Sequence, residues 1–199
     1  MISLQKGQKV SLSKEAPGLS KIIVGLGWDV MKKRGLFGFG SSSGQDCDLD
    51  ASVICCRNGF FSSKDDLVYF GNKHHSSGAI KHCGDNLTGE GDGDDEQIIV
   101  ELDKVPADID KIIVVVNIYS AHSRKQDFGM VENAYIRLVN NITGQEICRC
   151  DLSEDYGTNT ALVMGELYRH NGDWKFKAIE AGFDNGLSGL AGKYGLDAH

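Results

Sequence analysis

An acidic, glycine-rich stretch from residue 85 to residue 96 constrains this sequence more than any other feature. It holds six carboxylate side chains and three glycines within twelve residues. Carboxylates packed this closely repel one another unless they are solvated or share a cation. The glycines let the backbone turn sharply, so that carbonyl oxygens can point inward beside the carboxylates. The acidic residues are Asp85, Glu90, Asp92, Asp94, Asp95 and Glu96, and the glycines are Gly89, Gly91 and Gly93.

Two interpretations of this stretch follow from its chemistry. Calcium is bound in proteins by six to eight oxygen ligands at roughly 2.3–2.6 Å, which a tightly turning loop of carboxylates and carbonyls supplies. A run of charge can instead form a loop that is simply solvated. The stretch is not an EF-hand, because that motif needs a helix on each side, whereas Ile98–Val100 after it predicts a strand.

A second acidic cluster lies earlier in the chain. Asp46, Asp48 and Asp50 alternate with Cys47 and Leu49, so in a strand the three aspartates share one face. Like charges on one sheet face are destabilising unless something neutralises them. The alternative is an exposed strand edge that is kept soluble by its charge. The two clusters together supply nine carboxylates, and since one calcium ion takes no more than about four, the sequence predicts two ions.

The acidity of the chain is local. Removing the six charges of residues 85–96 from the net charge of −7 leaves −1 for the rest of the 199 residues. No basic stripe is present, so nucleic acid is not expected as a partner. The longest strongly apolar run, Ile112–Val116, is too short for a transmembrane segment. The N-terminus lacks a signal-peptide pattern, and we therefore expect a cytoplasmic location with reduced thiols.

The hydrophobic pattern predicts an all-β fold. About ten short strands recur at regular spacing, which is typical of a β-sandwich of two mainly antiparallel sheets. Thr160–His170 and Trp174–Ala181 flank an Asn-Gly pair, the strongest hairpin signal in the chain. Lys111–Tyr119 is almost wholly apolar and predicts a central strand buried on both faces. Leu187–Tyr194 predicts a short C-terminal helix, and the absence of a linker predicts one domain over residues 1–199.

The sequence carries no common catalytic motif. A nucleophile elbow, a phosphate-binding loop and a His-Glu-x-x-His pair are all absent from it. Two enzymatic alternatives to a binding protein remain open. One is a metal-dependent hydrolase that uses the acidic clusters. The other is a thiol-based redox protein that uses Cys148 and Cys150, although buried thiols that act as small hydrophobic side chains are the alternative for this pair.

Histidines and a cysteine also gather just before the acidic stretch. His74, His75, His82 and Cys83 match no common zinc-binding spacing. We therefore expect these histidines to be exposed in a turn rather than to hold a metal.

Several motifs resemble those of the TerD family of tellurium-resistance and stress-response proteins. The resemblance extends from the first strand to about Tyr194, and Cys47 departs from it where an aromatic residue is more usual. The loop at 31–45 is also longer and more basic than is usual in the family. The matching motifs are Gly25–Asp29, Asp48–Ser52, Gly84–Glu96, Val105–Asp110, Asn133–Arg137 and Gly165–Arg169.

The resemblance implies a β-sandwich that binds calcium through its acidic segments in a bacterial cytoplasm. It also implies a role in resistance to tellurite and other stresses, as a scaffold or signalling component with protein partners in a stress-response complex. Our hypothesis for the ligands includes glycine backbone carbonyls, with Asp29 and Asp46 as secondary candidates. The proposed ligands are Asp48, Asp50, Asp85, Asn86, Gly89, Glu90, Gly91, Asp92, Asp94, Asp95 and Glu96.

Overall fold

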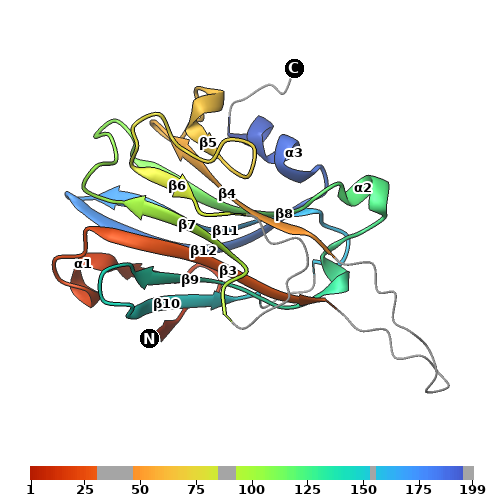
Figure 1. The fold of residues 1–199 in the computed structure, drawn as a ribbon, viewed down its shortest axis with the longest axis horizontal. Coiled ribbons are helices and arrows are strands. Elements are labelled where there is room, and N and C mark those ends of the chain that lie inside the picture. The colour runs from red at the N-terminus through yellow and green to blue at the C-terminus, as the bar shows by residue number, and fades with distance from the viewer. Residues whose placement is uncertain (31–46, 85–92, 153–155, 195–199) are drawn as a thin grey trace.

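The chain folds as two six-stranded sheets packed face to face (Figure 1). The computed structural model describes residues 1–30, 47–84, 93–152 and 156–194. All strand pairs are antiparallel except one, in which β1 runs parallel to β10. The predicted all-β sandwich of two mainly antiparallel sheets is confirmed.

The strands of each sheet come from distant parts of the sequence. Sheet A has the order β1 (Ile2–Ser3), β10 (Glu146–Asp151), β9 (Val131–Asn140), β3 (Lys21–Val30), β7 (Glu96–Glu101) and β6 (Ile80–His82). Sheet B has the order β2 (Lys9–Ser11), β12 (Asp173–Phe183), β11 (Ala161–His170), β8 (Lys111–Ile118), β4 (Leu49–Cys56) and β5 (Leu67–Val68).

Helical segments are short and lie outside the two sheets. The α-helices are α1 (Leu12–Glu15), α2 (Ala121–Arg124) and α3 (Gly186–Lys193), and the 3₁₀ turns are η1 (Lys64–Asp66) and η2 (Phe128–Met130). No helix among the described residues has the length and apolar character that crossing a bilayer requires.

The apolar run in β8 has the central place that the sequence predicts. β8 lies between β11 and β4 in sheet B. Its alternate side chains Ile112 and Val114 enter the core between the sheets, while Ile113 and Val115 point to the outer face of sheet B. Both faces are buried because α3 covers the outer one, which is why the run shows no polar alternation.

The Asn-Gly pair forms the predicted hairpin between β11 and β12. Asn171 and Gly172 both have positive φ, of 52° and 84°, which is the backbone of a type I′ turn. The turn sets the register in which His170 faces Asp173.

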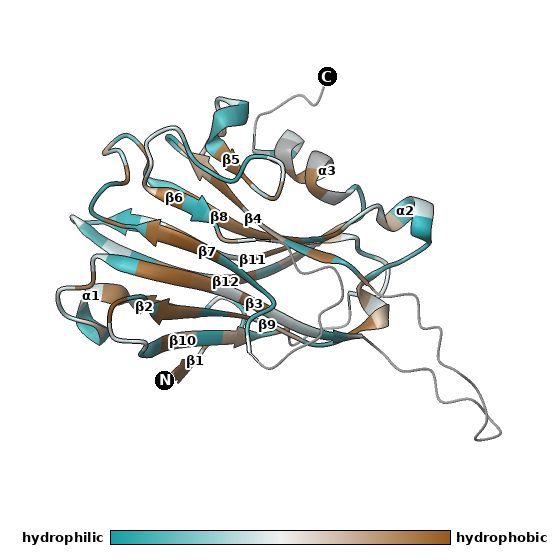
Figure 2. Ribbon diagram, in the orientation of Figure 1, coloured by the Kyte–Doolittle hydropathy of each residue, from teal (hydrophilic) through white to brown (hydrophobic). Residues whose placement is uncertain are grey.

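The residues that the structure describes form two hydrophobic layers. The larger layer lies between the sheets, and the smaller one lies between sheet B and α3, where Leu190 is fully buried. Figure 2 shows the hydrophobic residues concentrated on the strands, while many of the turns are hydrophilic. The second layer buries Ile54 and Cys56 on the outer face of β4, a strand that is buried along its whole length.

The edge strands on one side of the sandwich face each other. β6 is the edge of sheet A and β5 is the edge of sheet B, and the pairs β5–β6 and β4–β7 are in contact. We call this side of the molecule, formed by β4, β5, β6 and β7, the polar seam, because buried charged side chains cross it.

The Leu190 side chain gives a test of the second hydrophobic layer. We expect Leu190→Ala to lower the free energy of unfolding by about 2–5 kcal/mol, because it removes a buried side chain and leaves a cavity. Urea denaturation followed by circular dichroism measures this loss. The matched control is Ile142→Ala, since Ile142 is 72% exposed and its truncation should change stability by no more than about 0.5 kcal/mol. Equal effects of the two substitutions would contradict the packing of α3 on sheet B.

Candidate metal centre

Five of the eleven predicted ligands lie in the described part of the chain. They belong to two segments, one at the start of β4 and one at the start of β7. The described five are Asp48, Asp50, Asp94, Asp95 and Glu96. The other predicted ligands, Asp85, Asn86, Gly89, Glu90, Gly91 and Asp92, and the secondary candidate Asp46, lie outside the described residues.

Glu96 joins the two acidic segments. It is the first residue of β7, and it is 2% exposed. Its Oε2 accepts a hydrogen bond from the backbone N–H of Ala51 in β4 at 2.5 Å. His82 in β6 places its Nε2 3.5 Å from the same oxygen. Residues 94–96 are therefore held against the strand that carries Asp48 and Asp50, across the polar seam.

Asp48 and Asp50 are buried among polar groups. They are 4% and 2% exposed, so the alternative of an exposed, solvated strand edge is wrong. Asp50 accepts a hydrogen bond from Asn117 Nδ2 in β8 at 3.1 Å. Asp48 lies 3.4 Å from Arg124 Nη1 of α2. Burial of carboxylates is costly unless hydrogen bonds and positive charge compensate it. A bound calcium ion would supply further positive charge to these two side chains.

Asp94 is the anchor of the residues that lead into β7. Its side chain is 1% exposed and lies 2.7 Å from Arg137 Nε, and Gln97 donates a further hydrogen bond to it at 3.1 Å. A Cβ at Gly25 would overlap the Asp94 carboxylate. Gly25 in β3 therefore provides the space in which this ion pair lies. The role of Asp94 in a calcium shell stays a prediction.

Asp95 carries a charge that its surroundings disfavour. Its Oδ2 accepts a hydrogen bond from the Trp28 backbone N–H at 3.1 Å. Burial raises the pKa of Asp95, and the nearby charges of Asp29 and Asp94 raise it further, while the Trp28 hydrogen bond offsets part of the effect. A carboxylate with a raised pKa gains from a neighbouring cation. The secondary candidate Asp29 is exposed and accepts a hydrogen bond from Asn133 at 2.8 Å.

The described donor set fits calcium in chemistry but does not complete a shell. Carboxylate oxygens are the hard ligands that calcium prefers. Within residues 1–30, 47–84, 93–152 and 156–194, no group of three or more His, Cys, Asp or Glu side chains is arranged to hold an ion. A calcium shell at this place would therefore need ligands beyond these described carboxylates.

Comparison with known proteins decides the family. The model of the TerD domain matches residues 1–194. The chain belongs to the TerD domain family. It is 48% identical to the tellurium resistance protein TerD of Serratia marcescens, over 99% of this chain and 98% of that protein. It is 50% identical to general stress protein 16U of Bacillus subtilis (strain 168), over 98% of this chain and 97% of that protein.

The solved structures support the fold of this TerD-domain protein. A homologue of telluride resistance protein TerD from Streptomyces coelicolor A3(2) has a TM-score of 0.64 at 23% sequence identity, and the match covers 87% of this chain and 96% of that chain. At this level of identity the likeness shows a shared fold.

Two histidines of this TerD-domain protein are buried, although the sequence predicts that they are exposed in a turn. His75 and His82 are 3% and 1% exposed, so the expectation of exposed turn histidines is wrong for both, while His74 is exposed. Each buried ring faces a carboxylate, that of Asp66 for His75 and that of Glu96 for His82. Nothing in their spacing along the chain signals these partners, because both pairs form between separate elements of the polar seam.

The paired thiols of β10 are shielded. Cys148 and Cys150 are 1% and 0% exposed. Burial raises the pKa of each thiol to about 12, and nearby carboxylates contribute, Glu146 for Cys148 and Glu180 for Cys150. The Cys150 thiol donates a hydrogen bond to Glu180 at 3.4 Å. Thiol redox chemistry needs the thiolate, so this environment disfavours it at both residues.

Gly25 offers a test of the Asp94 anchor. We expect Gly25→Ala to lower the free energy of unfolding by about 1–3 kcal/mol, because the new methyl group overlaps the Asp94 carboxylate in a packed region. Differential scanning calorimetry measures the change. The control is Gly192→Ala in α3, where a Cβ meets nothing within 4 Å and where Ala should stabilise the helix by up to about 1 kcal/mol. A neutral Gly25→Ala would mean that the Asp94–Arg137 pair does not lie over β3.

Proposed function

We propose that this TerD-family protein is a calcium-binding module of a bacterial stress response. It takes two calcium ions and acts as a scaffold or signalling component in resistance to tellurite, in the cytoplasm and together with protein partners. The observation that carries this proposal is the contact of Glu96 with the backbone amide of Ala51, because it holds the acidic segment before β7 against β4, the strand that carries Asp50.

The carboxylates of the seam supply the affinity. Asp48, Asp50, Asp95 and Glu96 lie in the described part of the site, and Asp94 with residues of the 85–92 segment would supply further oxygens. Bound calcium supplies positive charge that offsets the mutual repulsion of these side chains. The hydrogen bonds from Asn117, the Trp28 amide and the Ala51 amide hold three of the described carboxylates in place. They limit the reorganisation that metal binding requires.

The stress-response role rests on the relatives. Two of them, with nearly full-length matches, are named a tellurium resistance protein and a general stress protein. We propose binding rather than thiol catalysis, because burial raises the pKa of both β10 thiols and disfavours the reactive thiolate.

Calcium should stabilise the folded protein. At a free calcium concentration a hundredfold above Kd, one site adds about 2.7 kcal/mol. For a chain of this length, this raises the melting temperature by about 5–11 °C. The measurement is a thermal melt with calcium and then with excess chelator, together with isothermal titration to count the ions.

Variants separate specific binding from a general salt effect. The double substitution of Asp48→Asn and Asp50→Asn should remove most of the calcium-dependent shift. The exposed carboxylate of Asp173 at the start of β12 provides the control, and Asp173→Asn should keep the shift. An unchanged melting temperature with calcium in the unsubstituted protein would rule out the proposed site.

Asp95 should show opposite effects on stability and on affinity. The raised pKa means that the ionised side chain costs free energy in the folded state. We therefore expect Asp95→Asn to leave the melting temperature in chelator unchanged or higher. Calcium affinity should fall by about 10–100-fold, the range seen when groups supporting a metal site are lost. A lower melting temperature in chelator with unchanged affinity would make Asp95 a purely structural residue.

A further inference from the structure

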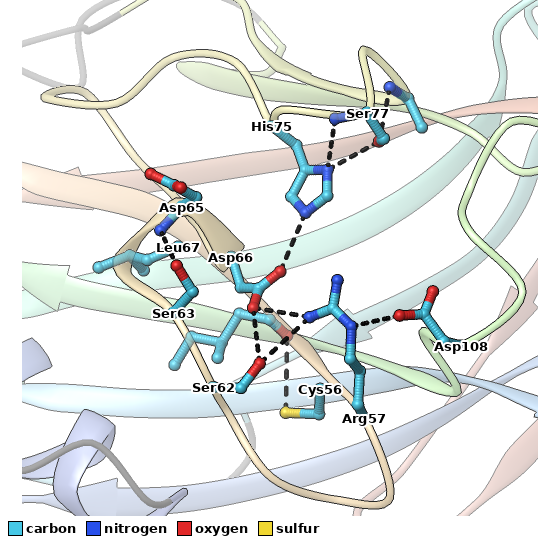
Figure 3. A network of polar contacts seen from close by, with 12 residues as sticks. Cys56, Arg57, Ser62, Ser63, Asp65, Asp66, Leu67, His75, Ser77 and Asp108 are labelled. Carbon is cyan, nitrogen blue, oxygen red and sulfur yellow. Dashed lines mark hydrogen bonds and ion pairs between the residues drawn. The ribbon is translucent and has the colours of Figure 1, made fainter.

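A second polar network lies at the other end of the polar seam, apart from the acidic segments. Figure 3 shows His75 between Asp66 and Ser77, with its two ring nitrogens turned to opposite partners. His75 Nε2 lies 3.2 Å from Asp66 Oδ1, and His75 Nδ1 lies 2.7 Å from Ser77 Oγ. The order carboxylate, imidazole, hydroxyl is that of an activated serine.

The hydrogen bonds fix where the protons are. The backbone N–H of Ser77 donates to His75 Nδ1 at 3.1 Å, so Nδ1 is an acceptor and the ring proton is on Nε2. Nε2–H therefore donates to Asp66. Ser77 Oγ accepts the backbone N–H of Ala79 at 3.2 Å, which leaves its own proton directed at Nδ1. This neutral tautomer is the form that acts as a general base.

Asp66 is held in its ionised state. Arg57 Nη1 lies 2.7 Å from Asp66 Oδ2, and Ser62 Oγ donates to the same oxygen at 3.2 Å. Burial works to raise the pKa of Asp66, but the hydrogen bonds from Arg57 and His75 outweigh it and the net direction is downward. An ionised carboxylate orients the imidazole and stabilises its protonated form.

Burial differs across the network in the way that a reactive serine requires. Asp66 and His75 are each 3% exposed, which keeps water away from the carboxylate and the ring. Ser77 is exposed in the turn before β6. A base that is buried and a nucleophile that is open to solvent allow a small electrophile to reach the hydroxyl oxygen directly.

A purely structural role accounts for only part of this arrangement. The hydrogen bonds from the Ser77 amide to His75 Nδ1 and from the Ala79 amide to Ser77 Oγ stabilise the turn. The Asp66 carboxylate belongs to η1, outside the turn, and Arg57 joins it to Asp108, which lies 2.6 Å from Arg57 Nε. A carboxylate held in this way orients an imidazole that acts as a base.

We propose that Ser77 is a nucleophile that accepts an acyl group from small activated acyl donors, with His75 as its general base and Asp66 as the positioning residue. In this step Ser77 Oγ forms a bond to the acyl carbon and the bond from that carbon to the leaving-group oxygen breaks. The hydroxyl proton passes to His75 Nδ1 and then to the departing alkoxide. Asp66 stays ionised throughout.

The local backbone limits the reaction to slow, near-stoichiometric acylation. The N–H of Gly78 donates to the His75 carbonyl and the N–H of Ala79 donates to Ser77 Oγ. Neither amide is available to stabilise a tetrahedral oxyanion. The base alone contributes about 10²–10⁴-fold. We therefore assign Ser77 as a modification site, which is independent of calcium binding.

The test uses the full-length protein and p-nitrophenyl acetate. We expect slow acetylation of Ser77 that approaches one equivalent per chain, followed at that residue by peptide mass spectrometry because the exposed thiol of Cys83 also reacts with the ester. Ser77→Ala should lower the total release of p-nitrophenolate by one equivalent, and Asp66→Asn should slow the acetylation of Ser77 at least tenfold. The neighbouring exposed Ser76 is the matched control, and Ser76→Ala should leave the acetylation of Ser77 unchanged. Thermal melts establish which variants are folded.

A second comparison uses substitutions in the exposed turn, so it does not depend on whether the Asp66 variant folds. Ser77→Cys and Ser76→Cys place thiols at neighbouring exposed positions. Because the side chain at position 77 contacts His75 Nδ1, the thiol there should react with iodoacetamide faster at neutral pH, measured peptide by peptide. Acetylation of Ser77 no faster than of Ser76, or equal alkylation rates at the two positions, would overturn the proposal. Acetylation of Ser77 that is unaffected by Asp66→Asn in a folded variant would also overturn it.

Discussion

The hydrogen bond from the Ala51 amide to the Glu96 carboxylate is the interaction on which the acidic region depends. At Ala51 the pairing of β4 with β5 has not yet begun, since β5 faces only Val53 and Ile54. Glu96 supplies the acceptor that a neighbouring strand would otherwise supply. A buried amide without a partner is expensive, so this hydrogen bond joins the two sheets beside the apolar contacts of the core.

Further buried polar contacts follow the polar seam along one side of the sandwich. His82 faces Glu96, and His75 faces Asp66, so two buried rings each meet a buried carboxylate from another element. The same strands also contribute apolar side chains to the main core, among them Ala51, Ile80 and Ile98. Because the charged contacts need defined geometry, the seam fixes the relative placement of β4, β5, β6 and β7 more narrowly than apolar packing does. A site that collects carboxylates from both sheets requires this placement.

Two of the motifs that resemble the TerD family, the glycine motif of β3 and the acidic motif before β7, contact each other in the structure. Gly25 in β3 leaves room for the Asp94 carboxylate, and Gly27 leaves room for the Tyr135 ring. Tyr135 in turn donates a hydrogen bond to the Gly93 carbonyl at 2.7 Å. The glycines of the Gly25–Gly27 motif therefore make the space that the residues of the acidic motif and Tyr135 occupy. Either motif read alone in the sequence looks like an ordinary glycine-containing strand or an ordinary acidic loop.

The sequence by itself determined the sandwich, the central position of β8 and the β11–β12 hairpin. These depend on local properties, namely apolar periodicity and the positive φ that Asn171 and Gly172 tolerate. It also predicted that the carboxylates of Asp48 and Glu96 belong to one ligand set, which stays a prediction. Only the tertiary structure decided that these carboxylates are buried, that His75 and His82 lie beside carboxylates, and that Arg137 holds Asp94. Those contacts join residues far apart in the chain or in different elements, and their energy depends on desolvation by neighbours that no local pattern encodes.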